Sequence, residues 1–124
     1  MPNVTDQLEP WPEELRLRPG GRELVVSFDN GEIFTFSAEF LRVESPSAEV
    51  KGHAPGQEIT VPGKRNVAIT RIEPVGNYAV RLIFSDGHAT GLFSWTYLSS
   101  IGHNQDELWQ KYLEALKQKG LSRD

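Results

Sequence analysis

The strongest constraint on the fold is the stretch RELVVSFDNGEIFTF, residues 22–36, in which apolar residues alternate with others on both sides of Asn30-Gly31. The alternating residues are Leu24, Val26 and Phe28 before this dipeptide, and Phe34 and Phe36 after it. Alternation predicts strands with one buried face, and an Asn-Gly pair tolerates the positive φ angles of a tight turn. The stretch therefore predicts a β-hairpin. Ser37 follows as the cap of a short helix.

A second segment repeats this pattern. Residues 27–41, SFDNGEIFTFSAEFL, and residues 83–98, IFSDGHATGLFSWTYL, each contain a phenylalanine, a turn with an acidic residue and glycine, a short strand, and a serine with a leucine four residues later. The second copy is one residue longer, as a β-bulge would make it, and Glu32 and His88 become equivalent positions. We infer two hairpin-plus-short-helix units that share one mostly antiparallel sheet, with helices against one face, which is an α+β fold.

Several further segments fit this architecture. ELRLRP (14–19), VAITRIEP (67–74), YAVRLIF (78–84) and HATGLFS (88–94) are predicted strands, and SWTYLSSIG (94–102) is a predicted helix with Ser94 as its cap. One face of the third strand carries Tyr78, Val80, Leu82 and Phe84. Asp86-Gly87 supplies a second hairpin turn. Each segment is therefore short and bounded by turn residues, as expected for antiparallel strands.

The C-terminal segment predicts an amphipathic helix over residues 104–120. Asn104 and Glu107 have the spacing of a capping box, and Gly120 ends the pattern. The apolar stripe consists of Leu108, Trp109, Tyr112, Leu113 and Leu116. Residues 1–12 contain three prolines and few apolar residues, which indicates a flexible N-terminal arm. The sequence thus divides into this arm, a folded domain over residues 13–103, and the helix packed on it.

Composition excludes several classes of function. The chain has 124 residues and a formal net charge of -4, whereas a nucleic-acid-binding protein is expected to show a basic surplus. It has no cysteine, so disulfides and thiolate-ligated metal centres are excluded. We find no membrane-spanning stretch, no signal peptide, no nucleophile elbow and no phosphate-binding loop. We therefore expect a cytoplasmic protein that binds neither nucleic acid nor membrane and is not an enzyme.

The stretch RVESPSAEVKGHAPGQ, residues 42–57, has no regular hydrophobic period and is long for a loop. Such loops are usually functional or disordered. The polar residues Glu49, Lys51 and His53 alternate with Ala48 and Val50, which predicts an extended segment pinned to the domain. We expect this loop to lie beside the Asp86-Gly87 turn.

Histidines raise the question of a metal site. His53, His88 and His103 lie in three different loops or turns, and Asp86 precedes His88 by two residues. Two histidines and a carboxylate suit zinc or ferrous iron when thiols are missing, so His88, Asp86, His53 and Glu49 are candidate ligands. The same Asp-Gly-His sequence also suits a plain hairpin turn without any metal.

Two segments together resemble a known family: LRVESPSAEVKGH (41–53) and GNYAVRLIFSDGHATGLFSWTYL (76–98). They are similar to the N-terminal domain of gamma-butyrobetaine hydroxylase and trimethyllysine hydroxylase, and to small stand-alone bacterial proteins that share this domain. In the hydroxylases, three loop cysteines and the histidine of the turn hold zinc. The corresponding positions here are Ser45, Ser47, Val50 and His88, and the first three cannot replace thiolates. Residues 13–103 are thereby identified with this domain.

The resemblance implies the fold and the position of the loop, and the iron-dependent catalytic domain of the hydroxylases is missing. Related domains are fused to ATPases that carry iron–sulfur clusters. We therefore expect a non-catalytic adaptor with a protein partner, accessory to iron–sulfur or metal metabolism. The alternative is a metal-binding protein that holds zinc or iron through histidine and carboxylate ligands. The predicted contact residues are Ser45, Pro46, Ser47, Glu49, Lys51, Gly52, His53 and Trp95.

Overall fold

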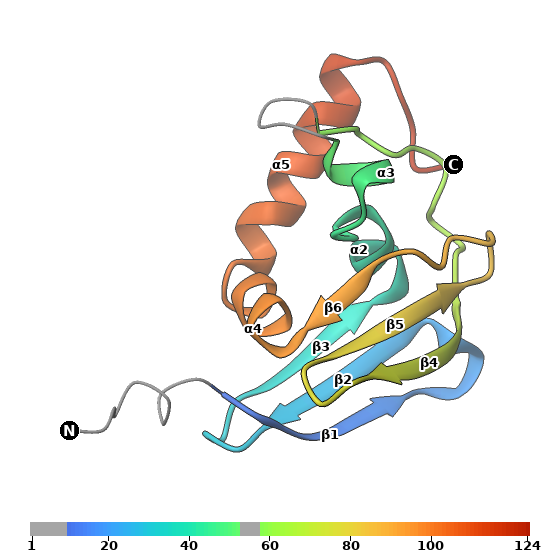
Figure 1. Ribbon diagram of the computed structural model, residues 1–124. Helices are drawn as coiled ribbons and strands as arrows, with labels where there is room; N and C mark the ends of the chain where they lie inside the picture. Colours follow the sequence, from blue (N-terminus) through green and yellow to red (C-terminus); the bar gives the residue numbers. More distant parts are fainter. Residues whose placement is uncertain (1–9, 53–57) are drawn as a thin grey trace.

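The computed structural model describes residues 10–52 and 58–124. Its strands form two three-stranded antiparallel sheets, with β2 and β5 in the centres. The first sheet contains β1 (Pro12–Leu17), β2 (Glu23–Phe28) and β3 (Ile33–Ser37), and the second contains β4 (Ile69–Val75), β5 (Ala79–Phe84) and β6 (Leu92–Ser94). The strands gather in the lower half of Figure 1, and the longest helix, Gln105–Gln118, lies in the upper half. The fold is therefore α+β, as predicted.

A helix follows each hairpin directly. α2 (Ala38–Val43) follows β3, and α4 (Trp95–His103) follows β6. The hydroxyl of Ser37 accepts a hydrogen bond from the N–H of Phe40 (3.0 Å), and the hydroxyl of Ser94 accepts one from the N–H of Tyr97 (3.1 Å). The other helical segments are a 3-10 turn, η1 (Pro19–Gly21), the short α3 (Ala48–Lys51), and α5 (Gln105–Gln118).

The two hairpins have equivalent turns. The N–H of Phe28 donates to the carbonyl of Glu32 over 2.8 Å, and the N–H of Phe84 donates to the carbonyl of His88 over 3.0 Å. Gly31 and Gly87 both have a φ of 90°. The matched bonds confirm the internal repeat and the equivalence of Glu32 and His88.

Some details differ from the predictions. The two units form separate sheets and do not share one. Only Leu92–Ser94 of the expected strand 88–94 pairs with β5, because the chain before Leu92 packs against the loop after α2. A Cβ built on Gly91 would lie 2.2 Å from Ser45 Oγ, which shows how close this approach is. Tyr78, expected on the core face, precedes β5 and is 54% exposed.

The core contains side chains from both sheets, from α2 and from α4. Its largest fully buried hydrophobic residues are Phe28, Phe36, Phe84, Phe93, Leu24, Leu41, Leu82, Leu98 and Val26. Phe36 and Phe40 stack with their ring centroids 6.0 Å apart, which joins the first sheet to α2. Burying each such side chain contributes roughly 1.5–3 kcal/mol relative to leaving it exposed. One shared core therefore holds the two units together.

The C-terminal helix forms with its predicted stripe, in which Tyr112 and Leu116 are buried. The helix begins after Asn104, as predicted, but the capping box does not form. The Asn104 side chain instead donates to the carbonyl of Ser100 (2.9 Å), at the end of α4. Over residues 10–52 and 58–124, every helix is too short or too polar to cross a bilayer.

At the N-terminal end, the ordered domain starts earlier than expected. β1 begins at Pro12, and Trp11 already exchanges hydrogen bonds with Asp29: the Trp11 N–H donates to the Asp29 carboxylate (3.0 Å), and the Asp29 N–H donates to the Trp11 carbonyl (2.8 Å). Residues 1–9 of the predicted arm lie outside the described residues. Trp11 therefore belongs to the domain and not to the arm.

The equivalent turns give a testable prediction. Gly87→Val should lower the free energy of unfolding by at least about 1–2 kcal/mol, because valine is strained at a positive φ. A Cβ at Gly87 would meet nothing within 4 Å, so the loss would come from backbone strain and not from a clash. Gly31→Val should cost a similar amount, and Thr35→Val serves as a control in an exposed strand position. Denaturant unfolding measures all three, and an unchanged Gly87→Val protein would contradict the turn geometry.

Candidate functional site

The segment after α2 carries several predicted site residues. Ser45 is fully buried and Ser47 is 8% exposed, whereas Pro46 between them is half-buried. Residues 48–51 form α3, so the predicted extended conformation is wrong there. The N–H groups of Val50 and Lys51 both donate to the carbonyl of Ser47, at 3.0 and 2.9 Å. One turn of helix is too short for hydrophobic alternation to distinguish it from a strand.

His88 is the centre of the site. Its side chain is 3% exposed, and its Nε2 lies 2.9 Å from Ser45 Oγ and 3.4 Å from Ser47 Oγ. Its Nδ1 lies 2.9 Å from Glu49 Oε1, which also accepts a hydrogen bond from the Thr90 hydroxyl (3.1 Å). The predicted position of the loop beside the Asp86-Gly87 turn is confirmed by these contacts. We call Ser45, Ser47, Glu49 and His88 the histidine pin.

The partners of the ring define its protonation. A carboxylate only accepts hydrogen bonds, so Nδ1 carries the proton that faces Glu49, and Nε2 accepts the hydroxyl proton of Ser45. Burial lowers the pKa of His88, and the nearby Arg42 guanidinium lowers it further, while Glu49 and Asp86 act in the opposite sense. The imidazole in the pin is therefore neutral at neutral pH.

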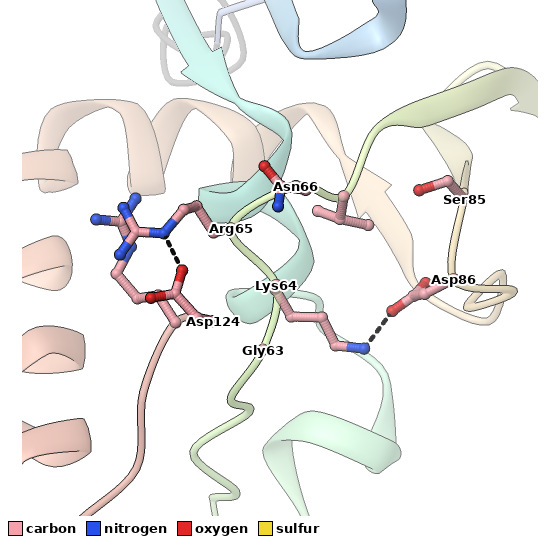
Figure 2. A pocket seen from close by; sticks show the side chains of 9 residues that line it. Gly63, Lys64, Arg65, Asn66, Ser85, Asp86 and Asp124 are labelled. Atoms are coloured by element: carbon pink, nitrogen blue, oxygen red, sulfur yellow. Dashed lines mark hydrogen bonds and ion pairs between the residues drawn. The ribbon is translucent and has the colours of Figure 1, made fainter.

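Asp86 supports the same turn from its other side. One carboxylate oxygen accepts the N–H of His88 (3.1 Å), and the other lies 2.8 Å from Arg42 Nε and 2.6 Å from Lys64 Nζ. Figure 2 shows the Lys64 side chain extended toward Asp86. Burial alone would raise the pKa of Asp86, but the hydrogen bonds from Lys64, His88 and Arg42 outweigh it and lower this pKa to about 2. Asp86 is therefore a fixed anion between two cations.

The hydrogen bonds of the pin connect a serine, a histidine and a carboxylate as in a serine hydrolase triad: Ser45 contacts His88, and His88 contacts Glu49. A nucleophile must reach its substrate, however, and Ser45 is 0% exposed. In a working triad the carboxylate is buried, whereas the Glu49 side chain here is 65% exposed. The arrangement therefore holds a loop in place and offers no accessible nucleophile at Ser45.

Other predicted contact residues lie around the pin. Lys51 Nζ lies 3.1 Å from Glu44 Oε1, and the Tyr97 hydroxyl donates to the carbonyl of Glu44 (2.5 Å). Gly52 ends α3 with a φ of 76°. Trp95, at the start of α4, is half-buried against the core. The loop is thus anchored to both α3 and α4.

The four candidate metal ligands do not form one cluster among the described residues. Glu49 contacts His88, but Asp86 is bound to two cations, and His53 lies outside the described residues. No group of three His, Cys, Asp or Glu side chains that could hold a metal occurs within residues 10–52 and 58–124. Two hydroxyls and the buried Val50 do not fit the cysteine zinc site that the resemblance implies. Metal binding therefore stays a prediction that depends on His53.

Three residues of this region were missed in the sequence. Arg42 and Lys64 both bind Asp86 but lie far from it along the chain, so no local spacing connects them. Gly91 packs against Ser45. An isolated glycine within a strand pattern often marks a close backbone approach, so Gly91 was the one residue that the pattern could have revealed.

These features define a small α+β domain of two strand–hairpin–helix units, joined by a buried histidine. The chain belongs to the family described as "Gamma-butyrobetaine hydroxylase-like, N-terminal", which matches residues 15–99. The resemblance inferred from the sequence is thereby confirmed.

Solved structures support the fold. Two solution NMR structures each match with a TM-score of 0.80: one is 49% identical and covers 99% of this chain and 90% of its own, and the other is 40% identical and covers 94% and 91%. A third match is the crystal structure of a protein of unknown function of the DUF971 family from Acidithiobacillus ferrooxidans. Its TM-score is 0.60 at 38% identity, over 73% of this chain and 91% of that chain. No curated protein matches the chain.

The pin predicts a local effect on dynamics. His88→Ala should lower the free energy of unfolding by about 1–3 kcal/mol, because it removes a buried hydrogen-bonding partner of Ser45. Amide hydrogen exchange of residues 45–52 should accelerate in the variant. His103→Ala is the matched control, because the His103 side chain is 51% exposed and pairs with Glu32. Fast exchange of the loop in both the parent and His88→Ala proteins would show that the pin does not hold the loop.

Asp86 predicts a pH dependence of stability. Its pKa falls from 3.8 to about 2 on folding, so its contribution is fully present above about pH 4 and is lost as the pH falls toward about 2. Asp86→Asn should therefore cost about 2 kcal/mol at neutral pH, and the difference from the parent should shrink at acid pH. Denaturant unfolding at several pH values tests this. Asp124→Asn, with a side chain that is 71% exposed, should change little. A pH-independent difference would contradict the assigned role.

Proposed function

We propose that the chain is a non-catalytic binding module that contacts a basic partner protein through an aromatic surface formed by Trp11, Tyr78 and Trp95. Trp11 is 51% exposed and Tyr78 is 54% exposed. The Trp11 ring packs edge-on against Trp95 with centroids 6.4 Å apart. Exposed tryptophan and tyrosine side chains are typical anchors of protein interfaces. This cluster is the observation that carries the proposal.

The rings of this surface are held by the backbone around them. The indole N–H of Trp95 donates to the carbonyl of Asn77 (2.9 Å), and the Trp95 N–H donates to the carbonyl of Tyr78 (3.1 Å). Trp11 is fixed by its two hydrogen bonds with Asp29. A partner would therefore meet side chains that are already ordered, which reduces the entropy lost on binding.

The charges at this end of the domain favour a basic partner. Glu13 and Glu14 follow Trp11 on β1 and are exposed, and Asp29 and Glu32 lie in the β2–β3 turn. The whole chain carries a formal net charge of -4. Complementary charge steers association and opposes the wrong partners. A partner segment that combines basic side chains with an apolar side chain for the aromatic surface fits this end of the domain best.

The loop supplies a second predicted contact region. Glu49 is exposed, and Pro46, Lys51 and Gly52 are half-buried, so they can be reached while Ser45 and Ser47 hold the loop from beneath. The resemblance to domains fused to iron–sulfur ATPases supports a cytoplasmic partner in iron–sulfur or metal metabolism. In this proposal the pin orders the loop, and the aromatic surface provides most of the binding energy.

Affinity capture from the cell of origin, followed by binding assays with the captured protein, tests the proposal. Trp11→Ala/Tyr78→Ser should lose the partner, since it removes both exposed rings. Ile33→Ser is the matched control, because Ile33 is 66% exposed on β3 and lies outside the aromatic surface. A variant that lacks residues 46–56 measures the contribution of the loop.

Three outcomes would contradict the proposal. The first is an identical set of captured proteins for the parent and the Trp11→Ala/Tyr78→Ser variant. The second is self-association of the parent in sedimentation that the same variant abolishes, because the surface would then join two copies of the chain. A captured partner without a basic segment would contradict the charge argument.

A further inference from the structure

A second feature lies at the other end of the strands. In Figure 1 the β4–β5 turn lies at the left, and the β1–β2 connection and the C-terminus lie at the right. A hollow of about 510 Å³ at this right-hand end is lined by Arg18, Pro19, Arg22, Glu23, Ser37, Glu39, Arg65 and Arg123. We call it the arginine hollow. Four guanidinium groups line it with two carboxylates, and a third carboxylate, that of Asp124, pairs with Arg65, so the hollow keeps a positive surplus on an acidic protein.

The four arginines are not equally neutralised. Arg123 donates to both oxygens of Glu39, at 2.6 and 2.8 Å, and Glu39 is only 6% exposed, so this pair is complete within the protein. Arg18 lies 3.5 Å from Glu23, and both side chains are about half exposed. An exposed pair at this distance contributes little. The Arg18 guanidinium is therefore available to an anionic ligand.

Arg22 and Arg65 remain the main donors. In the described part of the chain, Arg22 forms no ion pair, and its guanidinium donates to the carbonyl of Arg65 (3.1 Å). Figure 2 shows Lys64 and Arg65 pointing apart, Lys64 toward Asp86 and Arg65 toward Asp124. The Asp124 side chain is 71% exposed, so an incoming anion can compete with it for Arg65.

The backbone that carries Arg22 is rigid. Its carbonyl accepts the N–H of Ala38 (2.8 Å), and the preceding Gly21 lies against β4. A Cβ on Gly21 would come within 2.2 Å of the Ile69 carbonyl oxygen, so this turn has no room to shift. The Ser37 hydroxyl also lines the hollow and accepts from the N–H of Phe40, which leaves its own proton free to donate. The backbone at Arg22 is thus fixed, and its guanidinium is held by the bond to the Arg65 carbonyl.

We propose that the arginine hollow binds the phosphate group of a small organic phosphate. Guanidinium groups donate paired N–H bonds that match phosphate and carboxylate oxygens. A phosphate monoester carries nearly two charges at neutral pH, which suits Arg22 and Arg65 together, with Ser37 as a third donor. The volume is in the range of small-molecule sites and exceeds that of one phosphate group, so the organic part of the ligand occupies the remainder.

Titration with inorganic phosphate at constant ionic strength tests this site, with backbone amide NMR shifts as the readout. Saturable shifts are expected at residues 20–23, 37 and 64–66. Arg22→Gln/Arg65→Gln should weaken binding at least about tenfold. Arg16→Gln/Arg71→Gln removes the same charge from exposed strand positions outside the hollow and should bind like the parent. The single variant Arg22→Lys keeps the charge but loses the planar fork, and should weaken binding less than the double glutamine variant.

Three results would overturn the proposal: shifts that do not saturate, equal shifts with chloride, or equal binding by the parent and Arg22→Gln/Arg65→Gln. Succinate provides the carboxylate comparison, and binding as tight as that of phosphate would overturn the choice of phosphate. An unshifted thermal melt would show that a variant is folded, and Arg22→Gln alone replaces the double variant if that protein unfolds. Substitutions in the aromatic surface that abolish partner binding should leave the phosphate titration unchanged. Each of the two proposals can therefore be refuted without refuting the other.

Discussion

The buried ring of His88 is the contact on which the position of the loop between the two units depends. His88 belongs to the second hairpin, whereas Ser45, Ser47 and Glu49 follow the helix of the first unit. A ring that is 3% exposed must find partners for both nitrogens within the protein, because each unpaired buried group costs about 1–3 kcal/mol. This requirement fixes the loop after α2. Gly91 then has to lie against Ser45, which is why β6 pairs with β5 only from Leu92 onward.

The first hairpin makes the corresponding contact in the other direction. Glu32, the counterpart of His88, lies 2.5 Å from the ring of His103 at the end of α4. Each hairpin turn therefore contacts the segment at the helix end of the other unit. In the first turn the glutamate Glu32 contacts a histidine of α4, whereas in the second turn the histidine His88 contacts a glutamate of α3. The two contacts differ in energy, because His103 is exposed and Glu32 is partly exposed, while His88 is buried. The two units thus have equivalent backbone turns, but only the turn of the second unit is held by a buried side-chain contact.

Features that local chemistry determines were predictable from the sequence. The turn glycines Gly31 and Gly87, the helix caps Ser37 and Ser94, and the alternating core faces all depend on neighbouring residues. Contacts between distant segments were not: the Arg42–Asp86 pair, the separation of the strands into two sheets, and the arginine hollow all depend on tertiary packing. The contact between His88 and Ser45 was expected only through the family resemblance, because no periodicity connects a loop to a turn of another unit.

The family resemblance implies cysteines at positions where this chain has Ser45, Ser47 and Val50, so other contacts stabilise the loop here. Structural zinc contributes on the order of 10 kcal/mol in small metal-dependent domains, whereas a single hydrogen bond contributes about 1 kcal/mol. Several weaker contacts must therefore act together here: the pin, the Asp86 anion between Arg42 and Lys64, and the Tyr97 hydroxyl on the carbonyl of Glu44. None of these contacts uses a thiol, so thiol oxidation does not affect them. The ionised Asp86 holds the same turn, so the contacts of this turn weaken as the pH falls toward the Asp86 pKa of about 2.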